Sequence, residues 1–113
     1  MNAHGTSTPA GDAGETRVLK LALGADKAHR TPVSSTKGAT GHSLGAAGAI
    51  EAVISMLVAT TGQVPPTINN DDPDPECDLD CVPNVMRERP VRVALSNSFG
   101  FGGHNAAIAV RKV

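Results

Sequence analysis

One segment constrains the fold of this chain more than any other: a run of twenty residues, 42–61, that is apolar or small on nearly every side. Glu51 is its only charged residue. A helix that is apolar all round is buried at the centre of a protein rather than laid on its surface. Alanine and glycine are frequent in the run, so we expect a buried helix that is too short and too weakly hydrophobic to span a membrane.

The rest of the chain offers little to cover such a helix, because 113 residues form one domain at most. We expect an amphipathic helix over 12–23 and short strands over 31–35, 91–96 and 106–110, the last two as an antiparallel pair. These elements can hardly enclose the buried helix. The sequence therefore predicts an α/β chain that is incomplete as a domain and takes its cover from further sequence or from a partner subunit.

Charge and cysteine usage narrow the function classes. Ten Lys and Arg against eleven Asp and Glu leave a net charge of −1, which gives no basis for binding nucleic acid or an anionic membrane. Residues 64–89 hold most of the prolines and a cluster of acids, so we expect an extended surface connection. Cys77 and Cys81 lie there without a secretory signal or a further ligand pair, which favours idle thiols, a reducing cytoplasm and no metal site.

Two histidines lie in segments that suit catalysis. His4 is followed by GTST, four small residues that can orient an imidazole and leave space for a substrate. His42 lies at the start of the buried helix, where free N–H groups and the helix dipole favour a neutral imidazole that can donate a hydrogen bond to developing negative charge. A structural histidine and a polar helix entry remain the alternatives.

Glu51 needs a partner, because an ionised carboxylate on a buried helix is costly unless it is paired. Lys37, in the loop 36–41 before the helix, is the best local cation, and a buried pair would tune the protonation of both histidines. The alternative is that Glu51 faces solvent through a gap in the cover. Asp12 precedes Glu15 by three residues, the spacing of a capping box, so we interpret Asp12 as a helix N-cap.

The turn SNSFGFGGHN joins the last two predicted strands and holds both aromatic residues of the chain, Phe99 and Phe101. Its glycines allow an unusual backbone that offers N–H groups to an oxyanion, with a ring placed as a plug or gate. A tight turn between strands explains the same residues equally well.

Four ordered segments together resemble the C-terminal half of the 3-oxoacyl-[acyl-carrier-protein] synthases I and II, the condensing enzymes of bacterial fatty acid synthesis. They read NAHGTSTPAGD, STKGATGHSLGAAGAIEA, PPTINNDDPDPECDLDCVPN and SNSFGFGGHNAAI. The resemblance implies a thiolase-like fold of two α/β halves, each with a mixed five-stranded sheet. Residues 1–113 would then be a partial C-terminal ketoacyl synthase domain, and Met1 falls where the family's strand continues upstream.

The resemblance also implies a decarboxylative Claisen condensation. In the family a cysteine of the first half is acylated, malonyl-carrier protein loses carbon dioxide, and the resulting enolate attacks the acyl thioester. By motif position, the residues with implied roles are His4 and His42, which stabilise the enolate; Lys37, Glu51 and Asp12, which organise the site; Thr6 and Thr8, which contact the phosphopantetheine arm; and Phe101, a gate whose N–H completes the oxyanion hole.

No cysteine-bearing nucleophile elbow occurs in the chain, so we expect it to be inactive alone. The family's partners are acyl carrier protein and the malonyl and acyl thioesters; the full-length enzyme is expected to be a cytoplasmic homodimer with no cofactor beyond the carrier's phosphopantetheine. Three alternatives remain: a ketosynthase of a type II polyketide or aryl-polyene pathway, a non-catalytic ketosynthase partner, and a small module that binds acyl carrier protein.

Overall fold

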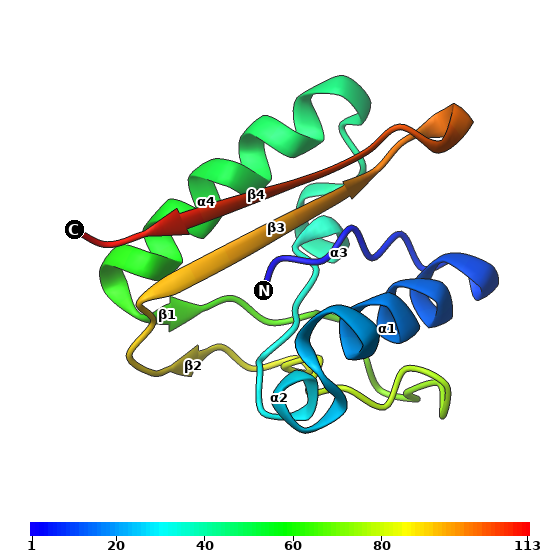
Figure 1. The fold of residues 1–113 in the computed structure, drawn as a ribbon, viewed down its shortest axis with the longest axis horizontal. Helices are drawn as coiled ribbons and strands as arrows, with labels where there is room; N and C mark the ends of the chain where they lie inside the picture. The colour runs from blue at the N-terminus through cyan, green and yellow to red at the C-terminus, as the bar shows by residue number, and fades with distance from the viewer.

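The computed structural model describes residues 1–113 and is built on a long helix laid across a β-hairpin (Figure 1). The helix, α4, spans Ala47–Thr61 and follows a short 3₁₀ turn, η1, at Leu44–Ala46. The hairpin joins β3 (Val93–Phe99) to β4 (Asn105–Arg111). The predicted antiparallel pair is therefore confirmed, and each strand is longer than the apolar residues alone indicated.

The N-terminal residues extend this hairpin by parallel pairing on the side of β3 away from β4. Asn2 bridges both Ser34 and Ser96. The Asn2 N–H donates to the Leu95 carbonyl at 2.7 Å, and the Ala3 N–H donates to the Ser34 carbonyl at 2.8 Å. The strand predicted over 31–35 is thus reduced to a single bridge, and the mixed arrangement places His4 at the end of the Asn2 segment.

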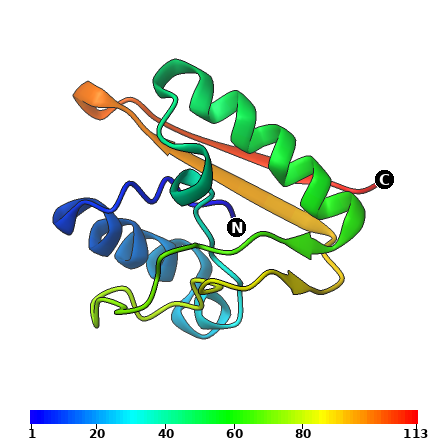
Figure 2. The same ribbon diagram turned by 180° about the vertical axis from the view of Figure 1, so that it is seen from behind.

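Two helices cover the other part of the molecule, α1 (Pro9–Leu23) and α2 (Ala25–His29) (Figure 2). Helix α1 begins at Pro9, whose fixed φ suits the first helical turn. Asp12 therefore lies inside that turn, and its assignment as the N-cap was wrong, because Thr8 occupies the cap position. The small core beneath these helices contains five residues: Ala3, Leu19, Ala28, Val33 and Leu79.

The helix predicted over 42–61 is confirmed from Ala47 onward, but it is buried on one face only. The inner face carries Glu51 and Ser55, each 2% exposed, whereas Met56 and Leu57 on the outer face are 49% and 56% exposed. Leu44–Thr61 also has the length and mean hydropathy, 1.6, of a candidate membrane span. The expectation that it is too short and too weakly hydrophobic was therefore wrong. As predicted, these 113 residues do not cover the helix on every side.

The connection between α4 and β3 is irregular over most of its length, as predicted. Two short strands, β1 (Gln63–Val64) and β2 (Arg87–Glu88), pair near its ends. Leu79 and Val82 are its buried anchors. This pairing holds the start of β3 beside the end of α4.

Candidate active site

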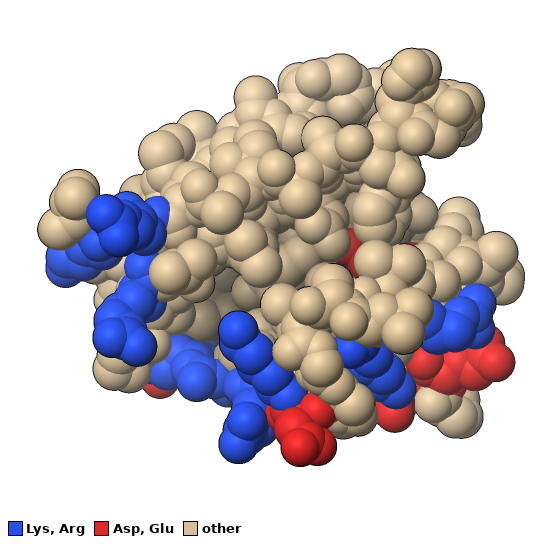
Figure 3. All heavy atoms as spheres, viewed as in Figure 1, with Lys and Arg blue, Asp and Glu red and all other residues tan.

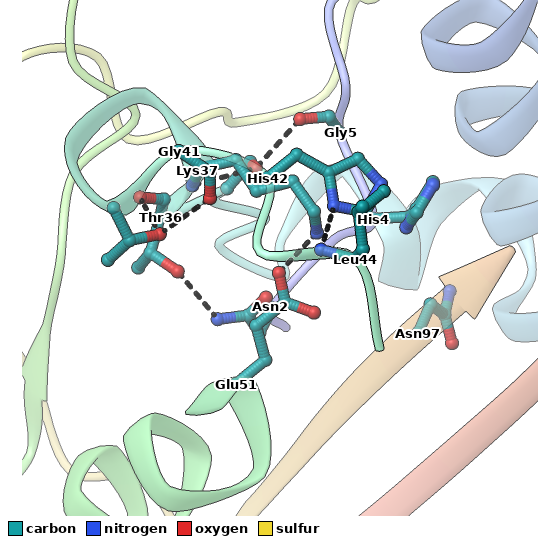
Figure 4. A network of polar contacts seen from close by, with 12 residues as sticks. Asn2, His4, Gly5, Thr36, Lys37, Gly41, His42, Leu44, Glu51 and Asn97 are labelled. Atoms are coloured by element: carbon teal, nitrogen blue, oxygen red, sulfur yellow. Dashed lines mark hydrogen bonds and ion pairs between the residues drawn. The ribbon is translucent and has the colours of Figure 1, made fainter. Parts of the chain in front are cut away.

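Two histidines from distant parts of the chain meet beside the end of β3. The ring centroids of His4 and His42 are 5.5 Å apart with their planes at 85°, an edge-to-face contact (Figure 4). The Phe99 ring lies 5.7 Å from that of His4. The structure therefore brings together the two imidazoles that the sequence singled out.

The turn that carries His4 is held by a buried carboxylate, Glu15 of α1, which is 5% exposed. Glu15 accepts hydrogen bonds from the N–H groups of His4 and Gly5, both at 3.0 Å, and from Asn97 Nδ2 at 3.3 Å. Charge-assisted bonds of this kind are stronger than neutral ones. The sequence pattern indicated Glu15 only as a capping-box partner and gave no signal for this contact with the His4 turn.

Gly5 and Ser35 lock the same turn from its other side. The Ser35 hydroxyl donates to the Gly5 carbonyl at 2.9 Å, and the Lys37 N–H donates to Ser35 Oγ at 3.4 Å. Gly5 has a φ of +40°, and a Cβ there would lie 2.6 Å from Ser35 Cβ. A larger residue does not fit, so glycine is required for the turn to approach the Lys37 loop.

The predicted Lys37–Glu51 ion pair is present and buried, with side chains 5% and 3% exposed. Lys37 begins a single helical turn, α3 (Lys37–Thr40), where a loop was expected. The second carboxylate oxygen, Glu51 Oε2, is buried without a hydrogen-bond partner. A buried pair of this kind is costly to desolvate, which favours a role in the site over a purely stabilising one.

The geometry favours a neutral His4 and selects the tautomer of a neutral His42. Burial lowers the pKa of His4, and the nearby Lys37 ammonium and His42 lower it further, against the opposing Glu15 carboxylate. The Leu44 N–H donates to His42 Nδ1 at 3.2 Å, so a neutral His42 carries its proton on Nε2. A neutral His4 beside a His42 that presents an Nε2–H can stabilise a developing oxyanion.

Asp12 does not contact the Lys37–Glu51 pair. Instead it lines a cavity of about 560 Å³ between α1 and the acid-rich connection, together with Thr8, Cys77 and Cys81. Asp12 lies in the first turn of α1, whereas Lys37 begins α3 and Glu51 lies on α4, which packs against β3.

Thr6 and Thr8 follow His4 on an exposed loop, with their hydroxyl oxygens 3.5 Å apart. Phe101 lies in a 3₁₀ turn, η2 (Phe101–Gly103), and is 93% exposed. The aromatic ring beside His4 is therefore that of Phe99, and Phe101 stands free at the tip of the hairpin.

The two thiols lack the environment of a nucleophile. Burial raises the pKa of both Cys77 and Cys81, and neighbouring carboxylates raise it further. Both are free cysteines. No group of three His, Cys, Asp or Glu residues has the geometry to hold a metal ion.

The architecture defines the class of protein to which the chain is similar. The chain superposes on thiolase-like ketosynthases. It matches a ketosynthase solved with its type II polyketide acyl-carrier protein with a TM-score of 0.94 and 44% identity, covering 99% of this chain and 27% of that one. It matches a beta-ketoacyl synthase from Burkholderia phymatum with a TM-score of 0.91 and 38% identity, again over 99% of this chain and 27% of that one. The expected fold, the C-terminal part of a thiolase-like enzyme, is therefore confirmed.

Sequence comparison gives the family. Residues 1–71 match the model of the beta-ketoacyl synthase C-terminal domain, and the chain belongs to the beta-ketoacyl synthase family. It is 59% identical over 112 residues to 3-oxoacyl-[acyl-carrier-protein] synthase 2 of Synechocystis, and 54% identical over 113 residues to that of Coxiella burnetii. The two matches cover 99% and 100% of this chain, but the chain spans only 27% of the length of each relative.

Proposed function

We propose that the chain is the C-terminal part of a 3-oxoacyl-[acyl-carrier-protein] synthase that condenses malonyl-carrier protein with an acyl thioester in fatty acid elongation. The observation that carries the proposal is the contact of His4 with His42 beside a buried Lys37–Glu51 pair. The 59% identity to the Synechocystis synthase supports this reaction over others of the fold.

In this mechanism His4 and His42 donate hydrogen bonds to the malonyl thioester carbonyl. The bond to the terminal carboxylate breaks, carbon dioxide leaves, and its electron pair forms an enolate that the two N–H groups stabilise. The enolate carbon then attacks the acyl thioester on a cysteine, a carbon–carbon bond forms, and the cysteine thiolate leaves. Lys37 and Glu51 position the imidazoles, and the Lys37 ammonium helps to keep His4 neutral by lowering its pKa.

The surrounding residues have supporting roles. Thr6 and Thr8 contact the phosphopantetheine arm from the exposed loop after His4. Phe101, free at the hairpin tip, closes over the substrate as a gate, and its N–H completes the oxyanion hole. Asp12 supports the site from α1, where the first helical turn favours a carboxylate.

The nucleophile and the remaining partners come from outside these residues. Neither Cys77 nor Cys81 contacts the histidine pair, and both thiols are held protonated, so the chain alone performs no condensation. The assembled enzyme is a cytoplasmic homodimer that acts on acyl carrier protein and its thioesters, with no cofactor of its own and no nucleic-acid or membrane partner.

A second candidate has support of its own. The similarity to the polyketide ketosynthase, 44% identity with a TM-score of 0.94, favours a ketosynthase that extends a polyketide rather than a fatty acyl chain. Both candidates use the same histidine pair. Its presence disfavours a non-catalytic partner, because a scaffold does not need an enolate site.

The test is to join this chain to the N-terminal part of the Synechocystis synthase and measure condensation of malonyl-carrier protein with an acyl thioester. We expect the joined protein to form the 3-oxoacyl product and the separate chain to form none. A folded joined protein whose cysteine is acylated but which forms no product would contradict the proposal. Repeated extension without reduction of the product would select the polyketide candidate.

A further inference from the structure

A groove of about 520 Å³ lies at the C-terminal end of α4, far from the histidines. Its walls are the last residues of α4, the segment 88–92 and Lys112. Lys and Arg side chains gather at this end of the molecule, beside the C-terminus (Figure 3). We call the groove with Arg89, Arg92 and Lys112 the basic groove.

These three cations have no carboxylate within 4.0 Å, whereas Lys20, Lys37 and Arg87 are each ion-paired. Glu88 is the only acid that lines the groove, beside three cationic residues, and the Arg89 guanidinium is turned toward the Arg30 carbonyl. The cluster is unexpected in a chain of net charge −1. The positive charge of this cluster exceeds the partial negative charge at the C-terminal end of α4, which is about half an elementary charge.

Backbone hydrogen bonds hold the walls of the basic groove in place. The Arg89 N–H donates to the Gly62 carbonyl at 2.9 Å, and the Lys112 N–H donates to the Arg92 carbonyl at 3.3 Å. Arg89 Nη1 also donates to the Arg30 carbonyl at 3.5 Å. The groove is therefore preformed, and a ligand need not order the backbone on binding.

The lining selects among negatively charged ligands. Only Ala59 and Val91 are apolar, so the groove lacks the apolar walls that bind small organic molecules. It contains no aromatic residue on which nucleic-acid bases could stack. Guanidinium groups pair bidentately with carboxylates, and an open groove accepts an extended segment.

We propose that the basic groove docks an acidic segment of a partner protein. The site is independent of the condensation chemistry. Fourteen residue steps of α4 separate its two ends, a distance of about 21 Å. A partner bound here leaves His42 and the start of the helix uncovered.

The test is the fluorescence anisotropy of a labelled hexaglutamate peptide titrated with the joined protein, in which this chain is completed by the N-terminal part of the Synechocystis synthase. We expect saturable binding that Arg92→Gln/Lys112→Gln weakens about tenfold or more, with the matched control Arg17→Gln/Lys27→Gln within about twofold of the parent. Both pairs of residues are exposed, and the two double variants remove the same charge. Arg92→Lys keeps the charge without the planar fork and is expected to bind with intermediate affinity.

Three results would overturn the proposal. The first is an absence of peptide binding, and the second is equal weakening by the groove and control variants, which would show attraction to net charge alone. The third is tighter binding of a single-stranded oligonucleotide or anionic vesicles of matched charge than of the peptide, which would assign the groove to another class of partner.

Discussion

Lys37 and Glu51 form an ion pair that the protein buries almost completely, at the junction of α3, α4 and the His4 turn. Each partner comes from a different element, and neither has another charged contact within 4.0 Å. The pair fixes the loop before His42 to the helix that follows it.

Removing one partner should destabilise the fold, because the other charge remains buried and unpaired. We expect Glu51→Gln to lower the free energy of unfolding by about 3–5 kcal/mol. Urea denaturation checks this, with Glu76→Gln at an exposed pair as the control that should change little.

The double variant Lys37→Met/Glu51→Leu separates stability from function. We expect it to recover most of the lost stability, because apolar residues of similar size replace the buried charges. In the joined enzyme, however, we expect this double variant to have no condensation activity. Full activity in this variant would show that the pair has only a structural role.

Gly5 and Gly14 provide a matched pair of substitutions. Gly5→Ala places a Cβ 2.6 Å from Ser35 at a φ of +40°, so we expect a loss of more than about 1 kcal/mol of stability. Gly14 lies within α1 with nothing within 4 Å of a Cβ, so Gly14→Ala should stabilise by about 0.5–1 kcal/mol. Thermal unfolding of both variants measures the difference, and equal effects would refute the close approach of Gly5 to Ser35.

Acid should weaken the fold through His4. Because the pKa of His4 is lowered from 6.5 in the folded protein, the unfolded chain binds the proton first as pH falls. The contribution of neutral His4 is fully present above pH 6.5 and is lost as the pH falls toward the lowered pKa. We expect the stability of the parent relative to His4→Gln to decrease as the pH is lowered from about 8 to about 5, measured in urea titrations. A difference independent of pH would contradict the lowered pKa.

The predictable parts of this structure depend either on neighbouring residues in the sequence or on one large free-energy cost, that of burying an unpaired charge. The β3–β4 hairpin follows from two apolar runs around a glycine-rich turn, and the Lys37–Glu51 pair follows from the cost of a buried charge. Glu15 was not predictable, because its partners His4 and Asn97 lie 11 and 82 residues away. A buried carboxylate that is satisfied by backbone N–H groups leaves no pattern in the sequence.

The outer face of α4 illustrates a second limit. Its apolar residues predicted burial on every side, whereas Met56 and Leu57 are exposed in these 113 residues. The resemblance alone predicts a gate at Phe101, and this role stays a prediction. Strand geometry brings the Phe99 ring against His4 and leaves Phe101 at the hairpin tip.

The most direct test of the enolate site measures malonyl decarboxylation and cysteine acylation separately in the joined enzyme. His4→Ala and His42→Ala should each abolish carbon dioxide release from malonyl-carrier protein while the cysteine is still acylated. His29→Ala, at an exposed histidine, should change neither step. Decarboxylation at the parent rate in both active-site variants would contradict the account.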